Sequence, residues 1–328
     1  ILFKSGKTLE KLADLQAISF DKTGTLTQGK PRVTNYKPLS DDPVVPQLFY
    51  SMERHSTHPL AVAITNFFKE EENLPLQVEE KAGFGLETNY HNQTWHLGKP
   101  RKNQQHPLID QWREEGKTVV VLSRNNEITA LLALMDLPKA HTKEVIGYFQ
   151  QQEIATVMLT GDNSGAARYV AQQLDLDDFH GECLPADKTN LIKAQQEMYS
   201  VNAMVGDGIN DAPALATASI GVAMGEGTDV AMEVSDMVLM KNDLTKLMYS
   251  HRLAKKMKRI IRQNIVFSLA VILLLIASNF LQFLTLPLGV VGHEGSTILV
   301  ILNGLRMLLP LKEFELKETN CTACPLYK

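Results

Sequence analysis

Asp21-Lys22-Thr23-Gly24-Thr25-Leu26-Thr27 is the stretch on which the expected fold rests. The run before it, Leu15-Gln16-Ala17-Ile18-Ser19-Phe20, predicts a buried parallel strand, and Thr23 and Gly24 favour a tight turn. Asp21 is therefore expected at the carboxyl end of a strand, where open parallel sheets place their sites. An ionised aspartate there can attack phosphorus and hold the phosphoryl group as an acyl phosphate. A bare Asp-x-Thr-Gly is more often an ordinary turn, so the assignment depends on the whole motif.

The full seven residues resemble the phosphorylation motif of P-type ATPases, which are of the haloacid-dehalogenase type. Soluble phosphatases of this type usually carry a second Asp two residues after the nucleophile, where it acts as general acid and base. Thr23 stands at that place, and its hydroxyl cannot transfer protons near neutral pH. We therefore expect the aspartyl phosphate to last long enough to drive a conformational change.

Length and composition limit the classes of protein to which this chain can belong. With 328 residues, 44% hydrophobic and 21% charged, the chain is long enough for two or more domains. The formal net charge of −4 gives no nucleic-acid footprint, and three cysteines are too few for a disulfide framework. The chain opens at Ile1 without an initiator methionine, and we expect it to be a fragment of a longer protein.

Two further motifs follow apolar runs and are expected at the same edge of the sheet. Thr160-Gly161-Asp162 offers a hydroxyl and a free glycine N–H, which suit a phosphate. Asp207 and Asp211 lie four residues apart on a Gly-rich turn and suit Mg²⁺, a hard ion that takes oxygen ligands.

The resemblance implies a role for each of these residues. Lys188 corresponds to the lysine that neutralises charge on the phosphoryl group. Asp207 would share Mg²⁺ with Asp21 and the backbone carbonyl of Thr23. Asn210 and Asp211 would hold the Gly-rich loop in place or contact the residues that bind Mg²⁺.

A nucleotide site is expected in the segment from about 30 to 132. The resemblance implies that Glu53 and His58 belong to the adenine-binding motif, in which Thr57 replaces the usual Glu. The pair Gly83 and Gly85 would let the backbone approach the nucleotide, although two such glycines commonly mark a hairpin or bulge. Lys117 is expected near the phosphates, with a surface lysine as the alternative. ATP is the implied substrate.

The last part of the chain carries a membrane signal. A basic stretch from 251 to 262 precedes an apolar run at about 265–284, long enough to span a bilayer with its start in the cytoplasm. A second span at about 286–309 would return, so the pair forms a hairpin. The tail carries Cys321 and Cys324, whose spacing supplies only two metal ligands and suggests an accessory role at best.

The second predicted span contains His293-Glu294-Gly295-Ser296-Thr297. Ionisable groups within a span are costly and are functional candidates, unless His293 lies at the outer interface. An imidazole beside a carboxylate suits a divalent transition metal better than monovalent copper. The pattern resembles the His-Glu-Gly motif in the last span of the zinc, cobalt and iron branch of heavy-metal ATPases, and we expect His293, Glu294 and Thr297 to bind the transported cation.

The expected fold is α/β: a haloacid-dehalogenase-like (Rossmannoid) phosphorylation domain with an inserted α+β nucleotide-binding domain, followed by two transmembrane helices. The expected boundaries are 1–29 and 133–255 for the phosphorylation domain, 30–132 for the nucleotide-binding domain, 256–310 for the membrane hairpin and 311–328 for a cytoplasmic tail.

The resemblance implies ATP-driven export of Zn²⁺, Cd²⁺, Co²⁺ or Fe²⁺ by a multi-pass protein of the plasma membrane with cytoplasmic catalytic domains. The actuator domain and earlier spans of such a pump are absent from this sequence. A soluble phosphohydrolase, a copper-transporting ATPase and a noncatalytic membrane partner remain as alternatives.

Overall fold

The computed structural model describes residues 1–81, 84–282 and 286–311. Its larger sheet has seven strands in the order β1-β13-β12-β11-β2-β9-β10. Every pair is parallel except β1 with β13. The strands are β1 (Leu2–Phe3), β2 (Ala17–Asp21), β9 (Ala155–Leu159), β10 (Asp178–His180), β11 (Asn202–Gly206), β12 (Ile220–Met224) and β13 (Met237–Leu239). β2 lies between β9 and β11 and is buried along its whole length, so Asp21 ends a central strand.

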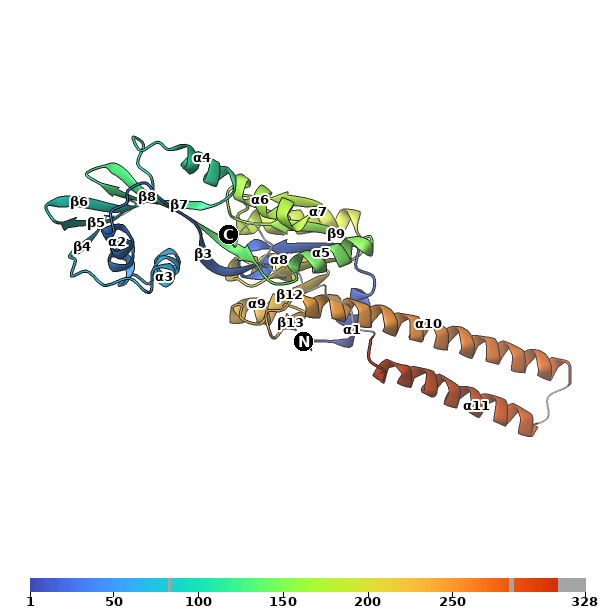
Figure 1. Ribbon diagram of the computed structural model, residues 1–328. Helices are drawn as coiled ribbons and strands as arrows, with labels where there is room; N and C mark the ends of the chain where they lie inside the picture. The colour runs from blue at the N-terminus through green and yellow to red at the C-terminus, as the bar shows by residue number, and fades with distance from the viewer. Residues whose placement is uncertain (82–83, 283–285, 312–328) are drawn as a thin grey trace.

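Helices cover both faces of this sheet (Figure 1). The helices are α1 (Gly6–Leu12), α5 (Thr142–Gln151), α6 (Ser164–Leu174), α7 (Pro185–Met198), α8 (Ala212–Thr217) and α9 (Asp229–Val234). One apolar core joins residues of α1, α5 and α6 to the sheet, and a second core joins residues of α7, α8 and α9 to it. Burial on both faces explains why the strands are continuous apolar runs rather than alternating ones.

A six-stranded antiparallel sheet is inserted after β2 in the order β3-β8-β7-β6-β5-β4. Its strands are β3 (Thr27–Pro38), β4 (Val78–Lys81), β5 (Gly85–Tyr90), β6 (Gln93–Gly98), β7 (Thr118–Arg124) and β8 (Glu127–Pro138). The helices α2 (Val44–Glu53) and α3 (Pro59–Phe67) pack over one core, and α4 (Pro107–Glu114) packs over another. The long strands β3 and β8 pair with each other and connect the two sheets (Figure 1).

The chain ends in a long helical hairpin that projects from the larger sheet (Figure 1). Among the described residues, α10 (Thr245–Phe280) is the one helix long and apolar enough to cross a membrane. α11 (Leu286–Leu305) packs against α10, and η3 (Arg306–Leu308) follows it. Bonds from Asn303 to Asn264 and from Lys256 to Leu309 show that α10 and α11 are antiparallel. That α11 is a second span stays a prediction, and Cys321 and Cys324 lie outside the described residues.

The first turns of α10 belong to the core of the larger sheet. Leu247 and Met248 are buried there, and His251 is only 1% exposed. Tyr148 of α5 lies 2.9 Å from His251 Nδ1 through its hydroxyl. Burial raises the pKa of Tyr148 to about 12, and burial and Lys255 lower the pKa of His251 to about 4. The neutral tyrosine and the neutral imidazole therefore share a buried hydrogen bond, which joins α10 to the core of the larger sheet.

This buried histidine makes stability depend on pH. The unfolded pKa of histidine is about 6.5, so the unfolded state binds the proton more tightly. The contribution of His251, about 3 kcal/mol, is complete above pH 6.5 and is lost as the pH falls toward 4. We expect the apparent Tm to fall less between pH 7 and pH 5 in His251→Gln, measured on the protein that carries this chain. An equal fall in both proteins would contradict this, and the exposed His55→Gln serves as control.

Candidate active site

Asp21 opens into a cavity of about 280 Å³ at the carboxyl ends of the parallel strands. Register explains the assembly, because Asp21 pairs with Leu159 on β9 and Phe20 pairs with Val205 on β11. The residues that follow these strands therefore meet at one edge. The sequence-predicted residues that line this cavity are Asp21, Thr23, Thr160, Gly161, Asp162, Lys188, Asp207, Asn210 and Asp211.

Lys188 is the cation at the centre of the cavity. It extends from the first turn of α7, is only 5% exposed, and its ammonium donates to Asp21 Oδ1. The same ammonium donates to Asp211 Oδ1 at 2.7 Å. Asp211 is also buried and accepts from the Gly208 N–H at 3.4 Å. One ammonium therefore faces two buried carboxylates.

The electrostatics of these groups reflect their burial. Burial raises the pKa of Asp21 to about 7, and the Asp211 carboxylate adds to the rise, while Lys188 opposes it. Burial and then Asp211 also raise the pKa of Asp207. For Lys188, burial opposes the charge, but Asp21 and Asp211 outweigh it and raise the pKa of the ammonium. The site concentrates more negative charge than its lysine neutralises.

The three carboxylates form an oxygen-ligand group that fits a hard divalent cation. One oxygen each from Asp21, Asp207 and Asp211 lie within 4.8 Å of one another. Mg²⁺ binds through one or two carboxylates and keeps several waters, and this donor set suits it. Asp211 is itself a member of this carboxylate group.

The backbone conformation and the close approach of Asp207 both favour glycine at position 24. Its φ of +73° lies in the left-handed region, and an added Cβ would overlap the carboxylate of Asp207. The turn η1 (Lys22–Leu26) thus brings the loop that follows β2 against Asp207. The Lys139 ammonium donates to the Gly24 carbonyl and so braces the same turn.

Two residues contribute contacts that the sequence reasoning missed. Lys22 forms an ion pair with Asp162, so the motif after β2 is tied to the motif after β9. Asp136 accepts from the Thr27 hydroxyl at 2.5 Å and from the Gly29 N–H at 3.1 Å, which ties β8 to the start of β3. Both side chains adjoin strand ends at this edge, and that position is the signal that could have found them.

A cavity of about 670 Å³ connects this site to the antiparallel sheet. Lys22, Asp162 and Asn163 line it from the larger sheet, and Lys117 lines it from the loop before β7. The Lys117 ammonium is buried and donates to Glu115 at 2.6 Å and to Asn35 at 2.9 Å. Lys117 is thus held at the cavity and is not a free surface lysine.

The expected adenine residues lie around the ends of α2 and α3. His58 begins α3, and its Nδ1 accepts from the Leu60 N–H at 3.2 Å, which leaves Nε2 without a partner among the described residues. Burial, and then Glu80, raises the pKa of Glu53 to about 7. Gly85 has φ of +124°, and an added Cβ would overlap the Leu97 carbonyl of β6. The packing of β5 against β6 is therefore enough to explain a glycine at position 85. Gly83 lies outside the described residues.

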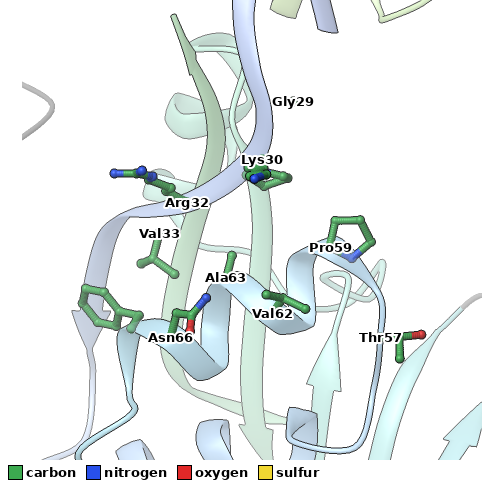
Figure 2. Close-up of a pocket in the computed structure, with 11 residues that line it drawn as sticks. Gly29, Lys30, Arg32, Val33, Thr57, Pro59, Val62, Ala63 and Asn66 are labelled. Carbon is green, nitrogen blue, oxygen red and sulfur yellow. The ribbon is translucent and has the colours of Figure 1, made fainter. Parts of the chain in front are cut away.

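A further cavity of about 630 Å³ lies beside this region, between β3 and α3. Figure 2 shows Lys30, Arg32 and Val33 of β3 opposite Val62, Ala63 and Asn66 of α3. Thr57 and Pro59, which flank His58, also line it. The helix that His58 caps therefore separates two hollows, since Pro59 and Leu60 border the cavity that leads to Asp21.

The expected cargo ligands lie on α11. His293, Glu294 and Thr297 are exposed in this chain, and the Thr297 hydroxyl donates to the His293 carbonyl at 3.2 Å. His293 and Thr297 are four residues apart and share one side of the helix, while Glu294 lies about 100° around it. Among the described residues, no third histidine, cysteine or carboxylate joins His293 and Glu294.

Comparison with known proteins identifies the family. The chain belongs to the haloacid dehalogenase-like hydrolase family, whose model matches residues 15–219. It is similar to the zinc-transporting ATPase of Bacillus subtilis (strain 168), with 45% identity over 324 residues that cover 94% of this chain and 50% of that protein. It is 37% identical over 329 residues to the cadmium-transporting ATPase of Staphylococcus aureus, covering 94% of this chain and 45% of that protein.

A solved structure gives the same relationship. The crystal structure of a zinc-transporting PIB-type ATPase in the E2.Pi state superposes with a TM-score of 0.87 at 35% identity, covering 94% of this chain and 52% of that one. The resemblance to heavy-metal P-type ATPases and the expected haloacid-dehalogenase-like α/β fold with its inserted domain are confirmed. The chain spans about half the length of the curated relatives it matches.

The tight fit of Gly24 against Asp207 predicts the effect of one methyl group. Gly24→Ala should lower the rate of phosphoryl transfer at least about 100-fold, because displacement of reacting groups by roughly 1 Å has that effect. The measurement is transfer of radioactive phosphate from ATP to the protein that carries this chain. Gly147→Ala, at a helical position with nothing within 4 Å of the added carbon, is the matched control and should retain the rate. Equal rates in the two variants would contradict the role of Gly24.

Proposed function

We propose that this chain is the catalytic part, with the last membrane segment, of an ATP-driven exporter of a divalent transition-metal cation. The observation that carries the proposal is the assembly of Asp21, Lys188, Asp207 and Asp211 at one strand edge, on a chain whose α10 is a candidate membrane span. The relatives named for zinc and cadmium transport support the cargo class.

The two sheets correspond to two catalytic domains in this proposal. Residues 1–29 and 133–255 form the phosphorylation domain, and 30–132 form the nucleotide-binding domain, with 256–310 as the membrane hairpin and 311–328 as a cytoplasmic tail. ATP lies along the cavity between the sheets, with adenine near Glu53, His58 and the glycines Gly83 and Gly85. Lys22 and Lys117 supply positive charge along the cavity for the phosphates.

The chemical step is transfer of the γ-phosphoryl group to Asp21. A carboxylate oxygen of Asp21 forms a bond to the γ-phosphorus while the bond to the oxygen that bridges to the β-phosphate breaks, and ADP leaves. Lys188 neutralises charge on the transferred group, and Thr160 and Gly161 donate hydrogen bonds to its oxygens. Mg²⁺ would supply further positive charge when bound. Its ligands would be Asp207, Asp21 and the Thr23 carbonyl, with Asn210, Asp211 and Asp162 around them.

The transported cation would bind at His293, Glu294 and Thr297 of α11. A nitrogen and two oxygen ligands suit a divalent transition metal, and such ions commonly take four or more ligands. The remaining ligands would come from the other half of a full-length pump, which in the relatives accounts for about half of the protein. That half would also contain the actuator domain needed to hydrolyse the phosphoenzyme.

ATPase activity across metals tests the proposal. The protein that carries this chain, in membranes, should be stimulated by one or more of Zn²⁺, Cd²⁺, Co²⁺ and Fe²⁺. Asp21→Asn should abolish ATP hydrolysis because the nucleophile is lost, and His293→Ala should abolish the metal stimulation because a ligand is lost. Stimulation by Cu⁺ alone would favour a copper pump. Activity that survives Asp21→Asn would overturn the proposed chemistry.

The lifetime of the phosphoenzyme separates a pump from a phosphatase. Thr23 lines the cavity but cannot act as a base, so Thr23→Asp should speed loss of phosphate from Asp21 by about 10² to 10⁴. Chase experiments on the radioactive phosphoenzyme measure this rate. Thr23→Asn, similar in shape but unable to transfer protons, is the matched control. If the wild-type protein already loses its phosphate as fast as Thr23→Asp, the result would favour a soluble phosphohydrolase.

A further inference from the structure

One side of α10 carries a row of polar and basic residues just before the helix becomes apolar. Arg252, Lys256, Arg259 and Gln263 follow one another at intervals of four, three and four residues, which places them along one side of the helix. Lys258, with its ion pair to Asp14, lies about 100° around the helix from Arg259. Lys258 therefore lies outside the row.

Arg306 of η3 joins this row from the other leg of the hairpin. Its Nη1 donates to Gln263 Oε1 at 3.3 Å and to Asn303 Oδ1 at 2.8 Å. These bonds use one nitrogen, so the Nε and Nη2 hydrogens of the guanidinium remain available. Lys256 donates to the Leu309 carbonyl at 2.6 Å, which fixes it at the same junction. We call Lys256, Arg259 and Arg306 the hairpin-base cations.

The hairpin-base cations have no acidic partner among the residues that the structure describes. Arg259 and Arg306 are exposed, so their charge faces the surroundings of the helix. The neighbouring cations on α10 that do have contacts, Lys255 and Lys258, bond to Gln152 and Asp14. An anion is therefore the complementary ligand for this junction.

The same side of α10 continues directly into an apolar strip. Val266, Ala270 and Leu273 extend the row at intervals of three, four and three residues from Gln263. Val266 is 60% exposed and Leu273 is 67% exposed. A ligand that matches both parts has an anionic head beside the cations and an apolar chain along the strip, which is the form of a phospholipid.

We propose that the hairpin-base cations bind the phosphate of an anionic phospholipid in the cytoplasmic leaflet. Arg306 and Arg259 hold the phosphate oxygens, Lys256 adds charge, and the acyl chains lie along Val266, Ala270 and Leu273. The bound head group then fixes the depth and rotation of α10, whose first turns lie in the catalytic core. The inference requires α10 to enter a membrane, and it depends neither on the transported metal nor on phosphorylation of Asp21.

The test measures lipid binding to the natural protein that carries this chain. The detergent-purified protein is titrated with phosphatidylglycerol or with phosphatidylcholine, and bound lipid is counted by native mass spectrometry. Wild type should prefer phosphatidylglycerol. Since each basic residue near such a surface contributes about 1 kcal/mol, Arg259→Gln/Arg306→Gln should weaken that binding roughly 30-fold. Arg259→Gln alone, at an exposed residue, should weaken it roughly fivefold and guards against misfolding.

Matched variants decide between specific and general effects. Lys258→Gln removes the same charge from a position outside the row, about 100° around α10 from Arg259, and should keep wild-type affinity. Arg259→Gln/Arg306→Lys keeps a positive charge at position 306. It should bind phosphatidylglycerol more tightly than Arg259→Gln/Arg306→Gln does. Equal binding of both lipids, or an equal loss in Lys258→Gln, would overturn the proposal. Displacement of phosphatidylglycerol by inorganic phosphate at equal concentration would assign the site to a free anion instead, which also overturns it.

Discussion

The buried contact of Lys188 with Asp21 and Asp211 is the constraint on which the rest of the catalytic region depends. Three carboxylates converge at this edge, and among the described residues one ammonium bonds to two of them. Charge in a buried site is costly unless it is paired. Burial raises the pKa of Asp21, and the neighbouring Asp211 carboxylate adds to the rise. Under the proposed function, a divalent cation would offset this negative charge when the phosphoryl group binds.

The convergence of the motifs at Asp21, Thr160 and Asp207 could be predicted from sequence because parallel strands carry these residues on their ends. Each motif is local, and the pairing of β2 with β9 and β11 brings them together without any further information. The nucleotide region was harder, because its contacts join distant segments. Lys117 is held by Asn35, which is 82 residues away, and the hollow between β3 and α3 depends on helix packing. The sequence supplies no pattern for such pairings.

In the C-terminal helices, too, some features could be predicted from sequence and others could not. The basic stretch and the apolar run predicted one long helix that could span a membrane, and α10 occupies both. They did not predict that its first turns are buried in the catalytic core or that Tyr148 meets His251 there. The single histidine in a long polar and basic stretch gives no sign of burial by itself. Its environment comes from α5, about one hundred residues earlier in the chain.

Under the proposed function, the position of His293, Glu294 and Thr297 on a single helix explains why this chain alone would not complete a metal site. His293 and Thr297 are four residues apart and Glu294 and Thr297 are three apart, so the three side chains lie on adjoining parts of one helix surface. The remaining ligands would therefore have to come from other helices. The catalytic core, in contrast, is joined to α10 rather than to α11. Any movement of α10 reaches α11 through the packed hairpin and its polar bonds, Asn303 to Asn264 and Arg306 to Gln263. Under the proposed function, coupling between phosphorylation and cargo thus runs through the cytoplasmic base of the hairpin, where the two helices are bonded to each other.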